Sequence, residues 1–352
     1  MQLITIGQNQ AGQRLDKFLH KLLPQAGTGF LYKMLRKKNI TLNGKKAECS
    51  ERLALGDQVR LFFAQETYEK FSGQLVDQYE RAYKELNGIR VVYEDDHVLI
   101  LDKPAGVLTQ KAQPDDISLN EWMIGYLLKH EDHFERELES FRPSVCNRLD
   151  RNTSGLVLCG KSLPGLQYLS NCIKLRNVRK FYRTICVGEL ISETLIKGYL
   201  VKDLERNKVY IIPAEDKAVV MEGEESQINE TGMFPPGDEI ETAYRPVKIG
   251  DGYTLLEVEL ITGKPHQIRA HLASLGHPLI GDFKYGNLQI NKRFKDQCGL
   301  QHQLLHAFRV EFPRTDEPVG IHLSGKSIIT PCPELFVKIQ EDLGLGLTDE
   351  KI

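Results

Sequence analysis

The sequence predicts an α+β protein made of two units joined by a polar segment. In residues 1–65, two amphipathic helices are followed by an alternating strand with an Asn-Gly turn. From residue 88 onward, short apolar and β-branched runs bounded by glycine and proline indicate strands, with helical stretches between them. We therefore expect a small helix–helix–hairpin module, followed by a domain with a mixed, largely antiparallel sheet flanked by helices and loops.

Two helices and a hairpin account for the first unit. Leu15 begins an apolar stripe at helical spacing, and Pro24 ends that helix because proline cannot continue it. A second helix is expected near 30–38. Residues 39–46 then alternate as a strand and contain an Asn-Gly dipeptide, the strongest short-range indication of a β-hairpin.

Cations gather in two groups along the chain, although the whole protein has a formal net charge of −2. The first group lies on the second helix and the hairpin: Lys33, Arg36, Lys37, Lys38, Lys45 and Lys46. The second group lies farther along the chain: Lys174, Arg176, Arg179, Lys180 and Arg183. Such runs usually cover a solvated face, but both groups could also follow a phosphate backbone.

The second unit, residues 88–352, is expected to be rich in strands. Helices are predicted near 119–129 and 163–175, and residues 254–260 alternate as a half-buried strand. A short helix near 333–339 is expected to close the chain.

Two segments carry no clear motif. Residues 66–87 are polar and lack a clean apolar period, so we expect a linker or a mobile helix between the units. The insertion at 195–241 is acid-rich and partly alternating. We expect it to be a peripheral hairpin or an element of specificity.

Asp150 is the candidate for chemistry. It lies between two arginines in the run Asn-Arg-Leu-Asp-Arg-Asn-Thr-Ser-Gly at 147–155, on a turn that enters a short apolar strand. A carboxylate beside cations keeps its charge at neutral pH, and an ionised carboxylate can act as a nucleophile or a base. From these residues alone, Asp150 and Thr153 could instead only shape the turn through hydrogen bonds to the backbone.

Four segments together resemble the RluA family of pseudouridine synthases. They are Lys-Pro-Ala-Gly at 103–106, Arg-Leu-Asp with Thr-Ser-Gly at 148–155, Lys-Phe-Tyr-Arg at 180–183, and His-Gln-Ile-Arg at 266–269. Residues 12–63 resemble the S4 RNA-binding domain. The resemblance implies an enzyme that isomerises uridine to pseudouridine in RNA, and because no redox change occurs it implies no cofactor.

The resemblance also implies roles for three residues. Asp150 is the catalytic aspartate, Tyr182 lies against the target base, and Arg269 is the partner of Asp150. The sequence does not choose between attack of Asp150 on the ribose C1′, attack on the base C6, and removal of the C2′ proton through a glycal.

Further residues are expected to contact the RNA. Arg148 is the candidate to fill the gap that a uridine leaves when it flips out of its stack. Lys180, Lys264 and His266 are expected to contact the RNA, as are the cations of the second helix and the hairpin. An S4-like module ahead of the catalytic domain resembles the members that modify large-subunit ribosomal RNA, which is the expected substrate, with transfer RNA as the alternative.

Three residues depart from the usual motifs of the family. Asn147 stands where a histidine is usual, and Lys264 and Pro265 replace an Arg-Thr or Arg-Ser pair. A lysine keeps the positive charge but loses the bidentate geometry of arginine. These departures leave open the alternative that the protein is a catalytically inactive RNA-binding relative. The retention of all three catalytic candidates argues against that alternative.

Other classes of enzyme fit the sequence less well. The histidines at 266, 271 and 277 match no zinc spacing, so no metal is expected. A base deaminase would need a Pro-Cys-x-x-Cys site, and the Pro-Cys at 331–332 lacks the second cysteine. A phosphate-binding hydrolase would need a Gly-rich loop ending in Gly-Lys-Ser or Gly-Lys-Thr, and the Gly-Lys-Ser at 160–162 lacks the preceding glycine at the needed spacing. The sequence also lacks the Gly-x-Ser-x-Gly pattern of a nucleophile elbow.

The composition indicates a cytoplasmic protein. The seven cysteines are scattered, odd in number and without a Cys-x-x-Cys pair, which is typical of reduced thiols. No signal peptide and no apolar stretch of spanning length is found. Without heptads or an excess of exposed apolar segments, we expect a monomer whose partner is RNA and which requires no protein partner.

Overall fold

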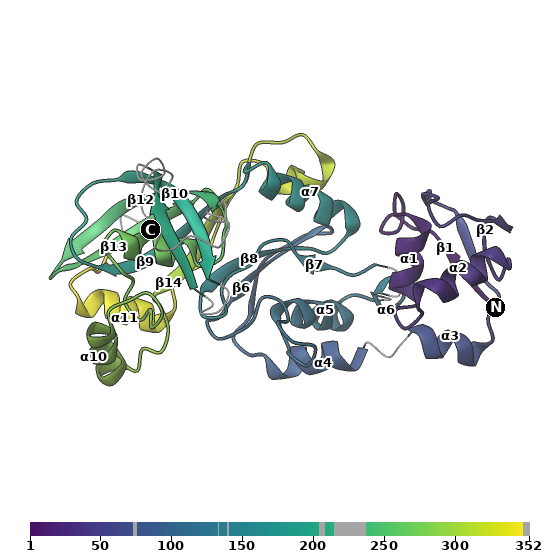
Figure 1. Ribbon diagram of the computed structural model, residues 1–352, viewed down its shortest axis with the longest axis horizontal. Coiled ribbons are helices and arrows are strands. Elements are labelled where there is room, and N and C mark those ends of the chain that lie inside the picture. Colours follow the sequence, from purple (N-terminus) through teal and green to yellow (C-terminus); the bar gives the residue numbers. More distant parts are fainter. Residues whose placement is uncertain (73–75, 133, 139–140, 204–207, 215–236, 348–352) are drawn as a thin grey trace, which may run out of the picture.

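The protein is elongated, with a small unit at one end and a larger one making up the rest (Figure 1). The computed structural model describes residues 1–72, 76–132, 134–138, 141–203, 208–214 and 237–347. Both units combine helices with a sheet, and the sheet of the larger unit is mixed, as the sequence predicts.

The small unit packs helices against a four-stranded antiparallel sheet. Its elements are β1 (Gln2–Thr5), α1 (Leu15–Leu22), α2 (Thr28–Arg36), β2 (Ile40–Leu42), β3 (Lys45–Lys46), β4 (Gln58–Leu61) and α3 (Gln65–Ser72), with strand order β1-β4-β2-β3. The apolar stripe of α1 is buried, including Leu15, Phe18 and Leu19. Asn43 and Gly44 both have positive φ, at 50° and 73°, as a tight hairpin turn requires, so the predicted hairpin is confirmed.

Residues 65–72 and 76–85 form two packed helices in the segment where the sequence leads us to expect a linker or a mobile helix. Tyr68 and Phe71 of α3 pack against the core of the small unit. The next helix, α4 (Val76–Glu85), places Tyr79 and Ala82 in the core of the large unit. These residues do follow a helical period, but tyrosine and alanine are weakly apolar, so the period is faint in the sequence. The change from one unit to the other therefore lies between α3 and α4.

The large unit is built on a long sheet of which one pair of strands is parallel. Its strands are β5 (Arg90–Glu94), β6 (Val98–Lys103), β7 (Ser144–Val145), β8 (Ser154–Gly160), β9 (Arg179–Val187), β10 (Thr194–Asp203), β11 (Lys208–Pro213), β12 (Asp238–Gly250), β13 (Tyr253–Leu260), β14 (Leu305–Glu311) and β15 (Ser327–Ile329). Their order is β11-β10-β12-β13-β9-β14-β8-β6-β5, with β15 beside β14 and β7 beside β8. Among the described pairs only β8 and β14 run parallel, so the expected largely antiparallel sheet is confirmed.

Helices cover both faces of the sheet near its middle. Besides α4 they are α5 (Leu119–His130), α6 (Phe134–Leu138), α7 (Leu163–Lys174), α9 (Gln267–Ser274), α10 (Leu288–Cys298), the 3-10 helix η2 (Pro318–Leu323) and α11 (Glu334–Asp342). Along β6, Leu99 and Leu101 join the core under α4 and α5, whereas Val98 and Ile100 join the core under α7. Period-two alternation explains why every residue of β6 is buried.

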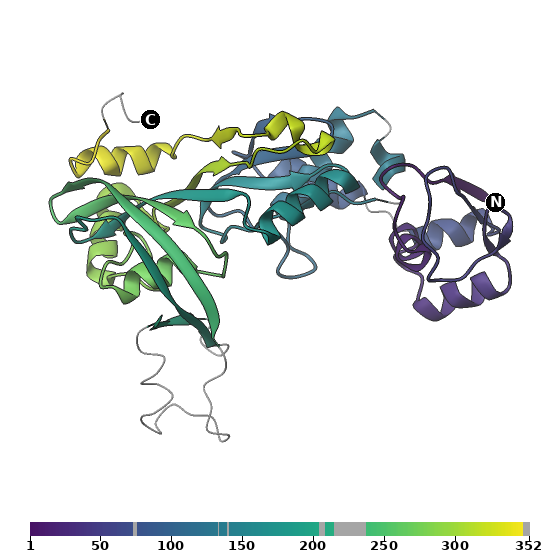
Figure 2. The same cartoon turned by 90° about the horizontal axis from the view of Figure 1, so that it is seen from above.

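Two helices and one strand predicted for the large unit lie close to their expected positions. The helix near 119–129, the helix near 163–175 and the strand at 254–260 correspond to α5, α7 and β13. The yellow C-terminal segment runs along the sheet to α11, away from the small unit (Figure 2). In the insertion at 195–241, β10 and β11 pair antiparallel at the sheet edge, while residues 215–236 lie outside the described residues.

The parallel pair of β8 and β14 brings the turn after Asp150 against a strand from the end of the chain. Gly155 has φ +113°, and a Cβ built on it would lie 2.3 Å from the carbonyl oxygen of Ala307. Next to it, the hydroxyl of Ser154 and Nδ1 of His306 are hydrogen bonded at 2.8 Å. Only glycine permits both the backbone conformation and this approach.

Gly155→Ala should therefore destabilise the protein. A strained φ and a Cβ pressed on backbone together cost on the order of 3 kcal/mol of unfolding free energy, as measured by urea unfolding. Gly29→Ala is the matched control, because Gly29 has no neighbour within 4 Å of the added Cβ and no positive φ. If Gly155→Ala and Gly29→Ala were equally stable, the conclusion that position 155 requires glycine would be wrong.

Candidate active site

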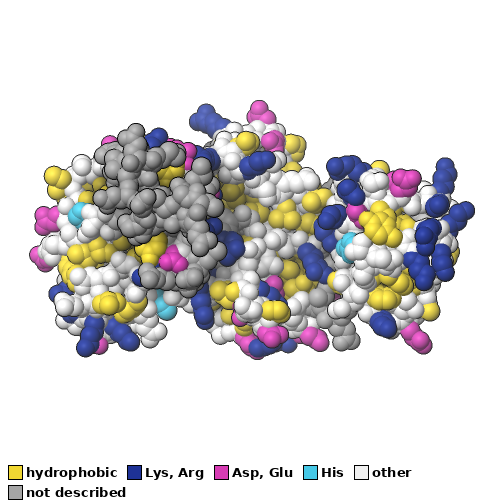
Figure 3. Space-filling view, in the orientation of Figure 1, with side chains coloured by type: hydrophobic (Ala, Val, Ile, Leu, Met, Phe, Trp, Pro, Cys, Tyr) yellow, Lys and Arg dark blue, Asp and Glu magenta, His cyan; other side chains and the backbone are white. Residues whose placement is uncertain are grey.

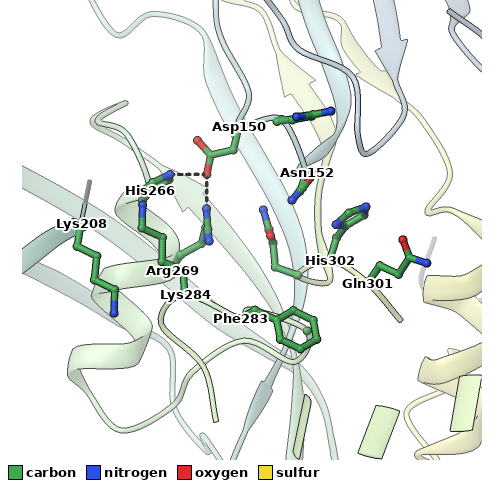
Figure 4. A pocket seen from close by; sticks show the side chains of 12 residues that line it. Asp150, Asn152, Lys208, His266, Arg269, Phe283, Lys284, Gln301 and His302 are labelled. Atoms are coloured by element: carbon green, nitrogen blue, oxygen red, sulfur yellow. Dashed lines mark hydrogen bonds and ion pairs between the residues drawn. The ribbon is translucent and has the colours of Figure 1, made fainter. Parts of the chain in front are cut away.

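A cavity of about 510 Å³ lies where five segments of the large unit meet (Figure 4). Its wall is formed by the loop 150–152, by Lys208 at the start of β11, by residues of α9 and its N-cap, by 281–284, and by 301–303. Asp150 lies in this wall with a quarter of its side chain exposed, at 25%. A partly exposed carboxylate at a cavity of this size can meet a small planar ligand.

The loop that carries Asp150 is held by hydrogen bonds from Lys103. The Lys103 ammonium is fully buried and donates to the carbonyl oxygens of Pro104, Val107 and Arg151 at 3.0, 2.9 and 3.0 Å. Burial lowers the pKa of Lys103 to about 7, while the charge of Asp150 acts in the opposite direction. Three backbone acceptors satisfy all three donors of the ammonium, so Lys103 ties two loops together.

The residue before Asp150 is held in the same way. The hydroxyl of Thr109 donates to the carbonyl oxygen of Leu149 at 2.8 Å, and the Leu149 N–H donates back to it at 3.2 Å. On the other side, the N–H of Thr153 donates to the carbonyl oxygen of Asp150 at 3.0 Å, closing the turn. Backbone on both sides of Asp150 is thus hydrogen bonded to fixed groups.

Arg269 joins Asp150 to a buried carboxylate. Its Nη1 donates to Oδ2 of Asp150 at 3.0 Å, as the sequence leads us to expect, and its Nε and Nη2 donate to the two oxygens of Asp282 at 2.7 and 2.9 Å. Asp282 is completely buried. Its Oδ1 also accepts the backbone N–H groups of Lys284 and Tyr285 at 2.9 and 3.0 Å. The guanidinium is therefore held in one orientation by a bidentate pair.

Both members of the buried pair keep their charge. Burial acts to raise the pKa of Asp282, but the hydrogen bonds and charge of Arg269 outweigh it and hold that pKa below its ordinary value. Burial likewise acts to lower the pKa of Arg269, and the hydrogen bonds and charge of Asp282, followed by those of Asp150, raise it instead. Arg269 is thus a permanent cation facing Asp150.

His266 faces the same oxygen of the Asp150 carboxylate as Arg269 does. It is the N-cap of α9 in the left-handed conformation, with φ 56°, and this turns its ring into the cavity. Nε2 is 3.9 Å from Oδ2 of Asp150, and Nδ1 is 2.9 Å from the hydroxyl of Tyr285. Burial, and then the charges of Arg269 and Lys284, lower the pKa of His266 against the opposing effect of Asp150, so the ring is neutral at pH 7.

Tyr182 lies behind the cavity rather than in its wall. It points from β9 into the core of the large unit and is 4% exposed. Burial, followed by the nearby charge of Asp150, raises its pKa, so the phenol keeps its proton. The structure thus brings Tyr182 close to Asp150 but leaves no open ring face on which a base could stack.

The second group of cations is divided by the alternation of β9. Arg179 pairs with Glu259 and Glu311 at 2.8 and 3.0 Å, and Arg183 is 3.4 Å from Glu257 on the same face. Lys180 lies on the opposite face, the face of Tyr182. Within β9, Lys180 therefore points away from Arg179 and Arg183, because neighbours in a strand point in opposite directions.

The other expected RNA contacts lie in different surroundings. Arg148 is exposed, and no residue of the described chain is hydrogen bonded to its guanidinium. Lys264 is paired with Asp238 at 2.8 Å, so contact with a phosphate would replace that carboxylate. The cations of α2 and the β2–β3 hairpin are all exposed, and lysine and arginine side chains crowd the outer end of the molecule in Figure 3.

Sequence reasoning missed several residues around the cavity. Asp282 follows a glycine and has the pattern of a turn residue, so nothing marks it as the partner of Arg269. Tyr285 is a lone tyrosine in the same turn. Lys208 comes from the motif-free insertion and is near Asp150 only because β11 folds back to the cavity. Lys103 was visible as part of a motif, but its three carbonyl acceptors were not.

The histidines that could be mistaken for a metal cluster have separate partners. Nδ1 of His271 is 3.0 Å from the Thr242 hydroxyl, and Nδ1 of His277 is 2.9 Å from the carbonyl oxygen of Val187. In the described ranges, no group of three or more histidine, cysteine, aspartate or glutamate side chains is arranged to hold a metal ion. All seven cysteines are free thiols. Among the described helices, none has the length and apolar character to cross a membrane.

Comparison with known proteins gives concordant matches. The family model for RNA pseudouridylate synthase matches residues 97–274. The chain is 31% identical over 309 residues to an uncharacterised RNA pseudouridine synthase of Mycoplasma pneumoniae, covering 86% of each chain. It is 28% identical over 346 residues to ribosomal large subunit pseudouridine synthase C of Vibrio vulnificus, covering 97% of this chain and 96% of that protein.

Among solved structures, the human RNA pseudouridylate synthase domain containing 4 has a similar fold. The TM-score is 0.57 and the sequence identity is 19%. The match covers 78% of this chain and 100% of the human chain. At this identity the likeness concerns the fold alone.

Asp282→Asn should destabilise the protein by about 3–5 kcal/mol at pH 7, because it leaves the buried Arg269 without its bidentate partner. The folded-state pKa of Asp282 is lowered, so its contribution is present above the unfolded pKa of about 4 and is lost as pH falls through the folded value. Urea unfolding of both proteins between pH 7 and pH 2 should therefore show a difference that shrinks in acid.

Glu80→Gln is the control for Asp282→Asn. Glu80 pairs with Lys84 at 2.9 Å on the exposed face of α4, and loss of such a pair changes stability little. A gap between Asp282→Asn and wild type that stays constant from pH 7 to pH 2 would refute the stated origin of the effect.

Proposed function

The chain belongs to the RNA pseudouridylate synthase family, in its RluA branch, and is an isomerase; on this basis we propose that it converts uridine to pseudouridine in large-subunit ribosomal RNA. The observation that carries the proposal is the Asp150 carboxylate, held by the fixed cation of Arg269 at the wall of a cavity that fits a nucleotide. Relatives named as large-subunit synthases align over nearly the whole chain, the small unit included, which supports ribosomal RNA over transfer RNA.

Asp150 is the catalytic aspartate of this proposal. In the isomerisation the bond between N1 and C1′ breaks, the uracil turns, and C5 bonds to C1′, while C5 loses its proton and N1 gains one. The atoms balance without an oxidant, so a carboxylate and a proton path suffice. An ionised carboxylate at the cavity wall can attack carbon or remove a proton, and both routes remain compatible with its position.

Arg269 orients Asp150 in this scheme. The guanidinium is fixed by Asp282 before substrate arrives, so the cation that faces Asp150 does not have to be repositioned during the reaction. Tyr182 is proposed to act on the base from behind Asp150. Because its ring is buried, contact with uracil requires side chains at the cavity wall to move when RNA binds.

Arg148 is proposed to replace the flipped uridine in the RNA. Extrusion of a base costs a few kcal/mol of stacking, which an inserted side chain offsets in part. Arg148 is exposed two residues before Asp150, so a guanidinium inserted in the stack would lie beside the extruded nucleotide. A guanidinium is planar and stacks on bases, which suits this role.

We propose that residues 1–65 are an S4-like RNA-binding domain and that residues 88–352 carry the catalytic site. The exposed cations of α2 and the β2–β3 hairpin supply the electrostatic contact with RNA backbone. Lys180, Lys264 and His266 would contact RNA nearer the cavity. Free cysteines fit a reducing cytoplasm, where we expect the protein to act as a monomer.

The inactive alternative receives no support from the residues that depart from the family motifs. Oδ1 of Asn147 accepts the N–H of Leu158 at 2.7 Å, so this side chain braces β8. The Lys264 N–H donates to Oε1 of Gln267 at 3.1 Å, within the loop before α9. Neither residue contacts the pair of Asp150 and Arg269, so the substitutions leave the proposed chemistry intact.

Asp150→Ala should lower pseudouridine formation at least about a thousandfold while RNA affinity changes less than about twofold. Purified protein would be incubated with unmodified ribosomal and transfer RNA transcripts, and pseudouridines mapped at single-nucleotide resolution. Wild type should modify large-subunit RNA. Asp115→Ala, in an exposed loop, should behave as wild type. Full activity of Asp150→Ala would refute the role of this carboxylate, and modification of transfer RNA alone would refute the substrate.

Exchange of Lys33, Arg36 and Lys37 for glutamine should weaken RNA binding without lowering the rate at saturating RNA. Each lost phosphate contact reduces the slope of log K against log salt by about one, so the slope should fall by up to about three. Titrations at several salt concentrations measure it. Lys292 and Lys295, exposed on α10, serve as control substitutions. An unchanged slope would exclude α2 from the RNA contact.

A further inference from the structure

The hydroxyl of Tyr285 connects the edge strand β11 to the active-site histidine. It accepts the backbone N–H of Val209 at 3.0 Å and is hydrogen bonded to Nδ1 of His266 at 2.9 Å. The Tyr285 ring packs with Val209 and Ala270 in a small apolar cluster, and it lies 5.2 Å from the guanidinium carbon of Arg269. One side chain thus touches the insertion, α9 and the cation that holds Asp150.

The direction of these hydrogen bonds fixes the tautomer of His266. Burial raises the pKa of Tyr285, so its hydroxyl keeps its proton. Val209 can only donate to that oxygen, and in the described part of the chain His266 Nδ1 is the acceptor within reach of the hydroxyl proton. If Nδ1 carried a proton and donated to the same oxygen, the hydroxyl proton would have no acceptor among these groups, so the arrangement favours an Nδ1 without a proton, which accepts from the hydroxyl. The proton of the neutral ring is then on Nε2.

Nε2 faces the catalytic carboxylate across a short gap. The distance from Nε2 to Oδ2 of Asp150 is 3.9 Å, which is too long for a direct hydrogen bond. Figure 4 shows His266 and Arg269 on the same side of the Asp150 carboxylate, both from α9 and its N-cap. The N–H of His266 is therefore available to an oxygen of a nucleotide that enters beside Asp150.

The strand that supplies the Val209 N–H also reaches the cavity. β11 is the edge of the sheet, so alternate N–H groups point away from β10, and that of Val209 is taken by Tyr285. The residue before it, Lys208, lies in the cavity wall. A group that binds at Lys208 thus acts on the same strand that orients His266.

We propose that Tyr285 is a positioning residue, which holds His266 as the Nε2–H tautomer facing Asp150 and makes this orientation depend on the seating of strand β11. The inference rests on the proposed function, since the oxygen that His266 meets belongs to the target nucleotide. The motif-free insertion is then part of the active site, and RNA bound at Lys208 and the donor at His266 are linked through one hydroxyl.

Tyr285→Phe tests the proposal, because it removes the hydroxyl and keeps the ring. Long-range ¹H–¹⁵N spectra of histidine-labelled protein distinguish the two tautomers, and His266→Gln identifies the signal. Wild type should show His266 as Nε2–H, and Tyr285→Phe should lose this preference. The single-turnover rate should fall about tenfold while RNA affinity stays within about twofold. Tyr210→Phe, on the exposed face of β11, should change neither quantity.

Val209→Pro provides a second test that leaves the tyrosine in place. Proline removes the N–H, and an edge strand tolerates it where that N–H points away from the sheet. Val209→Ala keeps the N–H and controls for lost packing. The rate of Val209→Pro should lie at least about threefold below that of Val209→Ala. Equal rates would overturn the link to β11.

The outcomes separate this inference from the proposed function. The tautomer is measured without RNA, so a wild type that forms no pseudouridine would refute the function and leave the positioning role to be judged by the spectrum. Nδ1–H in wild type, or the same tautomer and rate in Tyr285→Phe, would overturn the inference even if wild type is fully active.

Discussion

The position of the Arg269 guanidinium is the constraint on which the site depends. All three of its nitrogens donate hydrogen bonds: two donate to Asp282 and one donates to Asp150. A buried ion pair costs desolvation energy, which is offset only where geometry and further hydrogen bonds are good. Here Asp282 accepts two backbone N–H groups in addition to the two bonds from Arg269, so its buried carboxylate receives several hydrogen bonds. The cation presented to Asp150 is therefore a rigid feature of the fold.

The side chains around Arg269 and Asp282 differ in burial and in charge, and these differences decide which of them can meet a ligand. Asp150 has access to the cavity, whereas Asp282 has none, so two carboxylates on one guanidinium have separate roles set by burial alone. His266 is kept neutral beside them by burial. Lys103 holds the loop from the far side through backbone oxygens only. An anion, a fixed cation and a neutral donor thus meet at one wall.

Much of this arrangement could be predicted, and the failures have physical causes. Helices with strong apolar stripes, the Asn-Gly hairpin and the approach of Arg269 to Asp150 all follow from local pattern or motif. Period-two alternation was available in the sequence and would have separated Lys180 from Arg179 and Arg183. Asp282, Tyr285 and Lys208 are different, because their partners are set by how distant turns and an edge strand fold back. No spacing in the sequence records those contacts.

The pairing of strand β14 with the start of β8, just after Asp150, has a consequence for the order in which the protein folds. Ser154 and His306 are hydrogen bonded across 152 residues of chain. A growing polypeptide is made from its N-terminus at about 5–20 residues per second, so several seconds pass between the synthesis of the loop and that of the strand beneath it. Contacts so distant in sequence close late. The turn that carries Asp150 therefore gains this support only after the residues of β14 have been made.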